Sequence, residues 1–309
     1  MHALQQRPQT RRATIVVGVD GSGGAITAVR WAANHARETG AGLRLSYAFR
    51  EPGTATLTLP VPVGVAVPRR RPANPGRRLV TLAAAEARMY APDVEVSGHL
   101  KPGGPVDVLV AASADAALLV VGSRGLGRVA GSLTGSIGVQ VAAQAHCPTV
   151  VVRGEGDAGG PVVVAVDGLE ASEPALRFAF AEAARRRAGL VAVHAWSPPV
   201  VPAGAGRVLA HEMIAGPART ELRRAAHRLL AGAVAPWRSE FPHVGVAELV
   251  LEESPETALP KCTAGAALVV VGSRGRGRVA GLLLGSASQA VLAGAGCPVA
   301  VVRAPGTSG

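Results

Sequence analysis

Short apolar runs alternate along the whole chain with longer segments of helical periodicity. Most of the runs are continuous in Val, Ile, Leu and Ala, which is typical of parallel strands buried on both faces. They lie at residues 15–19, 43–49, 94–100, 117–121, 149–152, 162–166, 190–196, 244–251, 267–271 and 299–302. The run at 94–100 instead alternates apolar and polar residues, so it predicts a strand that is more exposed than its neighbours.

Between these runs, apolar residues recur at helical spacing. Helices are predicted at residues 25–38, 79–90, 103–114, 136–144, 172–187, 217–233 and 255–263. Alternating strands and helices favour parallel sheets with right-handed crossovers. We therefore expect an α/β protein with two tandem doubly wound parallel five-stranded sheets, strand order 3-2-1-4-5, and helices on both faces.

A glycine-rich loop occurs twice, each time directly after the fourth predicted strand of its half. Residues 122–136 and 272–286 are identical at twelve of fifteen positions, and the offset is 150 residues. A chain of 309 residues also suits two domains of about 150 residues each. The expected organisation is a flexible tail at 1–13, a first domain at 14–153, a linker at 154–160 and a second domain at 161–304.

One long segment interrupts this pattern. Residues 51–78 are rich in proline and arginine and have no periodicity, so they predict an irregular excursion, either a mobile lid or a disordered insert. We expect this segment to be mobile without ligand and to lie near the phosphate end of the first site.

Composition excludes several classes of function. The net charge of +11 invites a nucleic-acid interpretation, but aromatic residues make up 3% and none interleaves the arginine clusters, so nucleic acid is disfavoured as a partner. Three cysteines without a CxxC pair suggest neither a disulfide framework nor a zinc site. This cysteine usage fits a reducing cytoplasm, which is the expected location. No apolar stretch is long enough to span a membrane, so no membrane partner is expected.

The repeated loop contains what a phosphate site requires. Its glycines let backbone N–H groups approach an anion, and its last Gly-Ser pair begins a predicted helix, whose N-terminus attracts negative charge. Arg124 and Arg274 supply positive charge. Asp20 and Asp167, each after the first strand of its half, suit a ribose hydroxyl or an adenine amino group. If strands one and four are neighbours, acid and loop meet in one crevice, which predicts a nucleotide site.

Two familiar nucleotide motifs do not fit. A Walker A loop needs a Gly-Lys pair, and the chain has none. A dinucleotide-binding glycine motif would follow the first strand of a domain, whereas this loop follows the fourth.

At these motifs the chain resembles the universal stress proteins in their tandem-domain form. The family pattern of GxxG, nine residues and G[ST] is matched by Gly122, Gly125, Gly135 and Ser136, and by Gly272, Gly275, Gly285 and Ser286. The Val-Asp-Gly of the first strand is matched at residues 19–21 and 166–168, and the closing Cys-Pro-x-x-Val-Val-Arg pattern is matched in outline at 147–153 and 297–303.

The resemblance implies an ATP-binding regulatory protein linked to stress, dormancy or hypoxia, with one nucleotide site per repeat. It implies ATP as the ligand, with or without Mg²⁺, and it places adenine against the aspartate and the backbone of strand two. The implied binding residues are Asp20, Ala48, Val121, Gly122, Arg124, Gly125, Gly135, Ser136 and Ile137 in the first half, and Asp167, Ala195, Val271, Gly272, Arg274, Gly275, Gly285, Ser286 and Ala287 in the second.

Two departures from the family pattern bear on these sites. Members often read Asp-Gly-Ser-x-x-Ser, but Ala25 replaces the second serine in the first half and Leu169 replaces the first serine in the second half. Each site therefore lacks one hydroxyl, and unequal affinities are expected.

Three functional alternatives remain open at this point. The leading one is a regulatory module that binds an adenine nucleotide. A slow ATPase or phosphotransferase is the second, although no catalytic base pairs with a nucleophile in the sequence, and an adaptor that binds no nucleotide is the third. The apolar fifth strands would be exposed edges, so we expect them to meet and form an intramolecular pseudo-dimer, with a further homodimer left open.

Overall fold

The computed structural model describes residues 12–50, 75–123, 137–154, 156–157, 159–168, 172–197, 217–273 and 284–303. The first half consists of β1 (Thr14–Gly18), α1 (Gly23–Thr39), β2 (Gly42–Phe49), α2 (Pro75–Tyr90), β3 (Val96–Pro102), α3 (Pro105–Ser113), β4 (Leu118–Gly122), α4 (Ile137–Gln144) and β5 (Thr149–Val152). The second half consists of β6 (Val162–Ala165), α5 (Glu173–Arg186), β7 (Leu190–Ala195), α7 (Pro217–Glu240), β8 (Val246–Leu251), α8 (Pro255–Lys261), β9 (Leu268–Gly272), α9 (Ser286–Gly294) and β10 (Val299–Val302).

The strands form one sheet with the order β3-β2-β1-β4-β5-β10-β9-β6-β7-β8. Within each half, all pairings are parallel and the order is 3-2-1-4-5, so the predicted fold class is confirmed. The two five-stranded halves are continuous with each other, because β5 and β10 pair and join them into one ten-stranded sheet.

The junction between β5 and β10 is antiparallel and symmetric. Val150 lies opposite Ala300, with Val151 opposite Val299 and Thr149 opposite Val301. Val150 and Ala300 are equivalent positions under the 150-residue repeat offset, so the two copies of one position lie opposite each other at the centre of the junction. All residues of both strands are buried, so an apolar edge that would otherwise invite aggregation is paired here.

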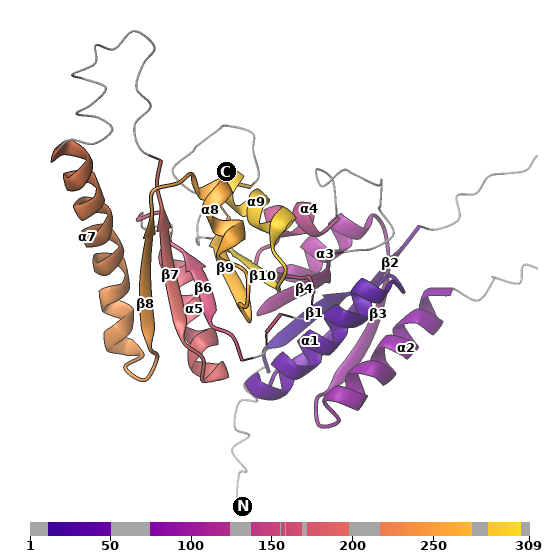
Figure 1. Ribbon diagram of the computed structural model, residues 1–309. Coiled ribbons are helices and arrows are strands. Elements are labelled where there is room, and N and C mark those ends of the chain that lie inside the picture. The colour runs from indigo at the N-terminus through magenta and orange to yellow at the C-terminus, as the bar shows by residue number, and fades with distance from the viewer. Residues whose placement is uncertain are drawn as a thin grey trace, which may run out of the picture.

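Helices cover both faces of the sheet (Figure 1). Helices α1, α2, α5 and α7 pack on one face, while α3, α4, α8 and α9 pack on the other. Each face has its own apolar core, made of alternate strand residues such as Val17 and Val120 on one side and Val16 and Val121 on the other. The strands are buried on both faces, which explains why their sequences read as continuous apolar runs.

The edge strands β3 and β8 differ from the central strands. Most residues of β3 are exposed or half-buried, and β8 alternates between exposed and half-buried positions. The prediction of a more exposed third strand is confirmed for β3. None of the described helices combines the length and the apolar character that crossing a bilayer requires.

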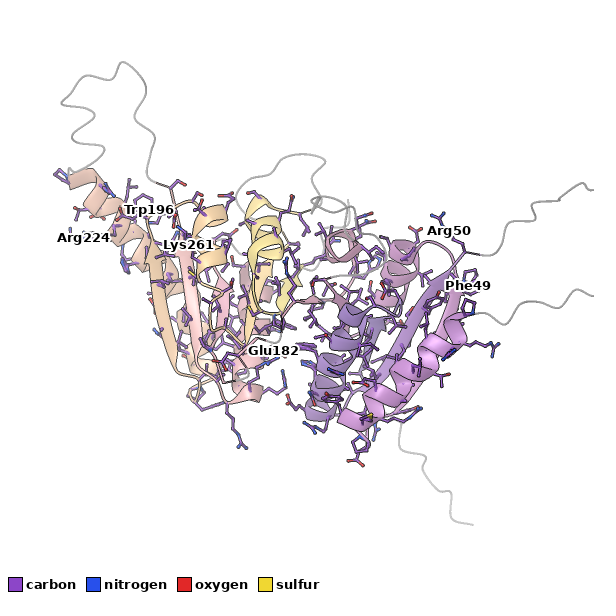
Figure 2. The ribbon with its side chains drawn as sticks, turned by 45° about the vertical axis from the view of Figure 1, so that its right-hand side comes forward. Phe49, Arg50, Glu182, Trp196, Arg224 and Lys261 are labelled. Carbon is purple, nitrogen blue, oxygen red and sulfur yellow. The ribbon has the colours of Figure 1, made fainter. Side chains whose placement is uncertain are left out.

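Equivalent helices of the two halves also meet, at α1 and α5. His35 and Glu182 are counterparts under the offset of 147 residues that relates Asp20 to Asp167, and their side chains lie 3.8 Å apart (Nδ1 to Oε1). Glu38 and Arg185 are related by the same offset and form an ion pair. Figure 2 shows Glu182 at this junction between the halves. The two copies have therefore diverged to different, complementary side chains at shared positions.

Burial shapes the titration of this pair. Burial, with smaller contributions from Arg185 and Arg186, lowers the pKa of His35 to about 3. Burial also raises the pKa of Glu182 to about 7, against the opposing effect of Arg186. His35 is thus a neutral histidine in the folded protein, stacked on the ring of Trp31 at 5.0 Å.

Two predicted helix boundaries were wrong. The helix expected at 217–233 continues to Glu240 as α7, with Pro236 inside it. Proline normally disfavours a helix interior, but Trp237 just after it stacks on the fully buried Phe180, Phe241 packs against the same ring in a tilted arrangement, and this packing outweighs the local cost. Helix α2 begins at Pro75, inside the segment predicted to be irregular, because proline is well accommodated in the first turn. The rest of that segment, residues 51–74, lies outside the described residues.

Candidate functional site

The strand order places the two predicted site features side by side. β1 pairs directly with β4, and β6 pairs directly with β9. From β1 the chain continues to β2 and β3 on one side, and β4 and β5 then follow on the other side of β1. The carboxyl ends of β1 and β4 therefore border the crevice at which the strand order reverses. A cleft lies at this position in each half.

The first cleft has a volume of about 120 Å³. Its described lining consists of Gly18, Val19, Asp20, Ser22, Ala25, Ser46, Tyr47, Ala48, Pro105, Leu109, Val121, Gly122 and Ile137. Asp20 lies at the end of β1, where its carboxylate accepts the N–H of Ser22 at 2.9 Å. Ser22 in turn caps α1, because its Oγ accepts the N–H of Ala25 at 3.2 Å. The first aspartate is therefore held by the turn that starts the helix.

The backbone of Ala48 is directed toward this cleft. The N–H of Val19 donates to the carbonyl of Ser46, so Ser46 turns its backbone groups toward β1. Strand residues alternate in direction, and Phe49 turns toward β3, where its carbonyl accepts the N–H of Gly103. Ala48 therefore presents its N–H and C=O on the β1 side, beyond Gly18 at the end of that strand. A donor and an acceptor in this arrangement match the hydrogen-bonding edge of a planar base.

The second cleft is larger, at about 440 Å³. Its described lining consists of Ala165, Val166, Asp167, Ser172, Val193, His194, Ala195, Trp196, Ser197, Pro255, Glu256, Leu259, Val271, Gly272, Gly285, Ser286, Ala287 and Ser288. Ala195 presents its backbone groups as Ala48 does, because the carbonyl of Val193 accepts from Val166 and the N–H of Trp196 donates to Leu251.

Asp167 is held differently from Asp20. The Ser172 hydroxyl donates to the Asp167 carboxylate, and the N–H of Asp167 donates back to Ser172 Oγ at 3.1 Å. Ser172 makes no capping hydrogen bond to α5, unlike Ser22 at the start of α1. Each half lacks a different serine of the family pattern, and the two aspartates have different partners: Asp20 accepts from the backbone N–H of Ser22, and Asp167 accepts from the hydroxyl of Ser172.

A buried histidine lies beside Asp167. His194 Nδ1 is 2.7 Å from the carbonyl oxygen of Val166. Since a carbonyl can only accept, Nδ1 carries the proton and Nε2 is the acceptor in the neutral ring. The next residue but one, Trp196, has a buried Nε1 with no hydrogen-bond partner among the described residues. Figure 2 shows Trp196 at the upper end of the second half.

The start of α9 forms the far wall of the second cleft. Gly285 is its N-cap, and the Gly285 N–H donates to the carbonyl of Ser273 at 2.9 Å. Ser288 Oγ donates to the carbonyl of Gly272 at 2.6 Å, which ties the first turn of the helix to the end of β9. Ser286 Oγ donates to Glu256 Oε1 at 2.5 Å. That hydrogen bond is the main reason that the pKa of Glu256 is lowered, so this carboxylate is ionised at neutral pH.

The described residues that were predicted from sequence gather in these two clefts. Asp20, Ala48, Val121, Gly122 and Ile137 line the first, and Asp167, Ala195, Val271, Gly272, Gly285, Ser286 and Ala287 line the second. The predicted residues Arg124, Gly125, Gly135, Ser136, Arg274 and Gly275 lie outside the described part of the chain.

Several lining residues were missed by the sequence reasoning. Those with polar side chains are Ser22, Ser46, Tyr47, Ser172, His194, Trp196, Ser197, Glu256 and Ser288. A signal for some of them was present: His194 and Trp196 are the last residues before a loop that follows a strand, and Glu256 stands in the first turn of a helix at the same edge. Ser288 had no such signal, because it lies inside a segment that reads as an ordinary helix.

Comparison with known proteins agrees with this architecture. A sequence model of the universal stress protein family matches residues 12–153 and 160–303. Universal stress protein Rv2623 of Mycobacterium tuberculosis is 38% identical over 297 residues, covering 94% of this chain and 96% of its own. Universal stress protein Rv2005c of the same species is 35% identical over 298 residues, with the same coverages.

A solved structure shows the same fold over nearly the whole length. The crystal structure of a universal stress protein from Archaeoglobus fulgidus aligns with a TM-score of 0.65 at 17% identity, covering 94% of this chain and 96% of that chain. With the family matched in both halves and relatives above one third identity along the chain, this protein belongs to the universal stress protein family.

Proposed function

We propose that this protein binds an adenine nucleotide in each of its two clefts and acts as a regulatory stress-response protein of the dormancy or hypoxia type. One observation carries the proposal. In each half, the aspartate after the first strand, the strand-two alanine with outward-turned backbone groups, and the glycine end of the fourth strand line a single cleft. These groups come from three separate segments of each repeat, and the same convergence occurs twice.

Each group has a chemical role in this proposal. The N–H and C=O of Ala48 and Ala195 pair with the edge of adenine, and the aspartates accept hydrogen bonds from an amino or hydroxyl group of the ligand. Gly122 and Gly272 have no side chain, so the ligand can approach the backbone closely at these two lining positions. The expected ligand is ATP, with or without Mg²⁺, and the Gly-Ser pairs at the starts of α4 and α9 would face its sugar and phosphates.

The alternatives give different experimental results. A slow ATPase or phosphotransferase would release product in a single-turnover reaction with Mg²⁺, whereas a regulatory binder would return its ATP intact. An adaptor without a ligand would carry no nucleotide when purified. Nucleotide extraction from freshly purified protein, followed by chromatography, therefore comes first.

Calorimetric titration with ATP is the direct test. We expect up to two sites in the wild type, and Asp20→Ala and Asp167→Ala should each weaken one site about tenfold, since a lost hydrogen bond to a neutral group costs about 0.5–1.5 kcal/mol. The double variant Gly125→Val with Gly275→Val should lose both sites while remaining folded. Normal ATP binding by that variant, or no affinity of the wild type for any adenine nucleotide, would contradict the proposal.

We also propose that the protein acts in the cytoplasm as an intramolecular pseudo-dimer. Its two domains would have the boundaries expected from the sequence, 14–153 and 161–304. The symmetric pairing of β5 with β10 and the contact of α1 with α5 support this arrangement. If so, either half expressed alone should self-associate or aggregate through its uncovered fifth strand, which light scattering would detect. Two well-behaved monomeric halves at high concentration would argue against it, and the same measurement on the full chain tests a further homodimer.

A further inference from the structure

The two clefts differ in charge at one wall. Pro105 and Pro255 are counterparts under the 150-residue offset, and both line their clefts. The residue after each is Val106 in the first half and Glu256 in the second. Val106 packs against the apolar core on its face of the sheet, whereas Glu256 lines the second cleft. At this position, therefore, the second copy has a carboxylate and the first copy has none.

Glu256 occupies the place where the phosphates of a nucleotide would be expected. Its carboxylate accepts the hydroxyl of Ser286, the first residue of α9. A helix N-terminus and a hydroxyl at that point attract an anion, and here the anion is the protein's own side chain. A phosphate chain entering this end of the cleft would have to displace Glu256 from Ser286 or lie beside a second negative charge.

Two ionisable acids, Asp167 and Glu256, are among the described lining residues of the second cleft, and His194 is hydrogen-bonded to the carbonyl of Val166. Arg274, which the sequence assigns to the same site, lies outside the described residues. Carboxylates are acceptors only, so they favour ligand hydroxyl and amino donors over phosphate oxygens. The hydroxyls of a ribose supply such donors, whereas a phosphate group beside Glu256 would bring a second negative charge close to the first.

We propose that Glu256 weakens the binding of phosphorylated adenine ligands in the second cleft, so that this cleft holds ATP less tightly, relative to adenosine, than the first cleft, which has Val106 at this position. This inference rests on the proposed function, because it assumes that both clefts bind an adenine nucleotide. It assigns the two repeats different affinities for the phosphates of the same ligand.

The test compares adenosine, AMP and ATP on the full-length wild type and on Glu256→Gln, which keeps the shape of the side chain and removes its charge. Binding at the second cleft is followed by the fluorescence of Trp196, identified as the part of the signal that Trp196→Phe abolishes. Calorimetry counts the sites in parallel. Glu253→Gln is the matched control, because Glu253 lies just before α8, pairs with Lys261 at 2.5 Å and is not among the residues that line the cleft.

We expect the second cleft of the wild type to gain less affinity from the phosphates of AMP and ATP than the first cleft does. Glu256→Gln should improve ATP affinity there by roughly tenfold, the size expected when one close like-charge repulsion is removed at a partly solvated site, and should leave adenosine within about twofold. Glu253→Gln should change neither. ATP binding at the first cleft should be the same in all three proteins.

Two results would overturn the inference while leaving the proposed function intact. An unchanged ratio of ATP to adenosine affinity in Glu256→Gln would show that the carboxylate does not discriminate. Weaker ATP binding in that variant, specifically with Mg²⁺ present, would show that Glu256 holds a phosphate-bound cation instead. If neither cleft of the wild type binds any of the three ligands, the proposed function itself fails and the inference falls with it.

Discussion

The two halves share a backbone plan but not the side chains of their clefts. Both have the order 3-2-1-4-5, an aspartate after the first strand and a glycine at the end of the fourth. The clefts differ at several paired positions in or beside their described linings, including Ala25 and Ser172, Ser46 and Val193, Tyr47 and His194, Val106 and Glu256, and Ile137 and Ala287. These positions lie at strand ends and in the first turns of helices, where substitution leaves the sheet hydrogen bonds intact. A duplicated fold can therefore keep its topology while its sites diverge.

The cores of the halves differ as well. In the first half, α1 and α2 meet the sheet largely through alanines, including the fully buried Ala33. Its counterpart in the second half is Phe180, whose ring lies 6.3 Å from that of Trp237 and 5.7 Å from that of Phe241. Small residues allow helix and sheet to lie close, whereas the aromatic cluster fills a wider gap with few side chains.

The largest effect should come from breaking this aromatic cluster. Phe180→Ala removes a fully buried ring, and we expect it to lower the free energy of unfolding by about 3–5 kcal/mol. Urea unfolding followed by tryptophan fluorescence is suitable, because Trp237 lies against the deleted ring. Leu222→Ala on the exposed side of α7 is the control and should cost less than about 0.5 kcal/mol. Equal costs for the two variants would contradict the assignment of Phe180 to the core.

The next effect concerns the close approach of β4 to α1 in the first half. A Cβ added at Gly122 would lie 2.5 Å from the carbonyl carbon and oxygen of Gly24, so Gly122→Ala must displace the start of α1. We expect a loss of about 2–3 kcal/mol in stability, as for other overpacked sites, together with loss of ligand binding at the first cleft only. Gly23→Ala is the control, since its added Cβ meets nothing within 4 Å. Retained binding at the first cleft would show that α1 does not shape that site.

A smaller effect tests the contact between the halves by pH. With a folded pKa of about 3 and an ordinary unfolded value of 6.5, His35 stays neutral in the folded protein while the unfolded chain takes up a proton below pH 6.5. Its contribution to stability is therefore complete above pH 6.5 and is lost as the pH falls toward 3. From pH 7.5 to 5.5 this loss amounts to about 1.4 kcal/mol.

His35→Gln should remove that loss, so on going from pH 7.5 to 5.5 the variant should gain about 1 kcal/mol of stability relative to the wild type. Glu182, whose pKa is raised, contributes in the opposite direction in both proteins, so the difference between the two profiles, and not either profile alone, reports on His35. The exposed His146, changed to Gln, is the control and should follow the wild type. Parallel pH profiles of wild type and His35→Gln would mean that His35 also takes up its proton in the folded state.

The smallest effect separates the roles of the two serines. Ser22→Ala removes the cap of α1 and should cost about 1 kcal/mol of stability in the first half. Ser172 does not cap α5 but donates to Asp167, so Ser172→Ala should mainly weaken ligand binding at the second cleft, by severalfold. Thermal unfolding and calorimetric titration of both variants give the comparison. If Ser22→Ala weakened binding and Ser172→Ala did not, the assigned roles would be reversed.

Much of the architecture could be predicted from local patterns. The apolar runs predicted the ten described strands within about two residues. The central strands gave continuous runs, because a strand buried on both faces needs apolar side chains at every position, whereas the edge strand β3 gave an alternating one. The repeated loops and the aspartates after strands one predicted where a cleft would form, since in parallel sheets the carboxyl ends of the strands share one edge. These features depend on neighbours in the sequence or on general rules of topology.

Other features depended on contacts between distant segments. The passage of α7 through Pro236 rests on Trp237 packing against Phe180 from another helix. The position of Glu256 beside Ser286, the bond between His194 and Val166, and the meeting of His35 with Glu182 each join residues at least 28 positions apart. Local periodicity carries no information about such pairs. The sequence alone thus determined the strands, the duplication and the edge of the sheet where the sites lie. Only the tertiary structure decided which side chains face each other across each cleft and across the junction between the halves, because those distances are set by how the helices pack on the sheet.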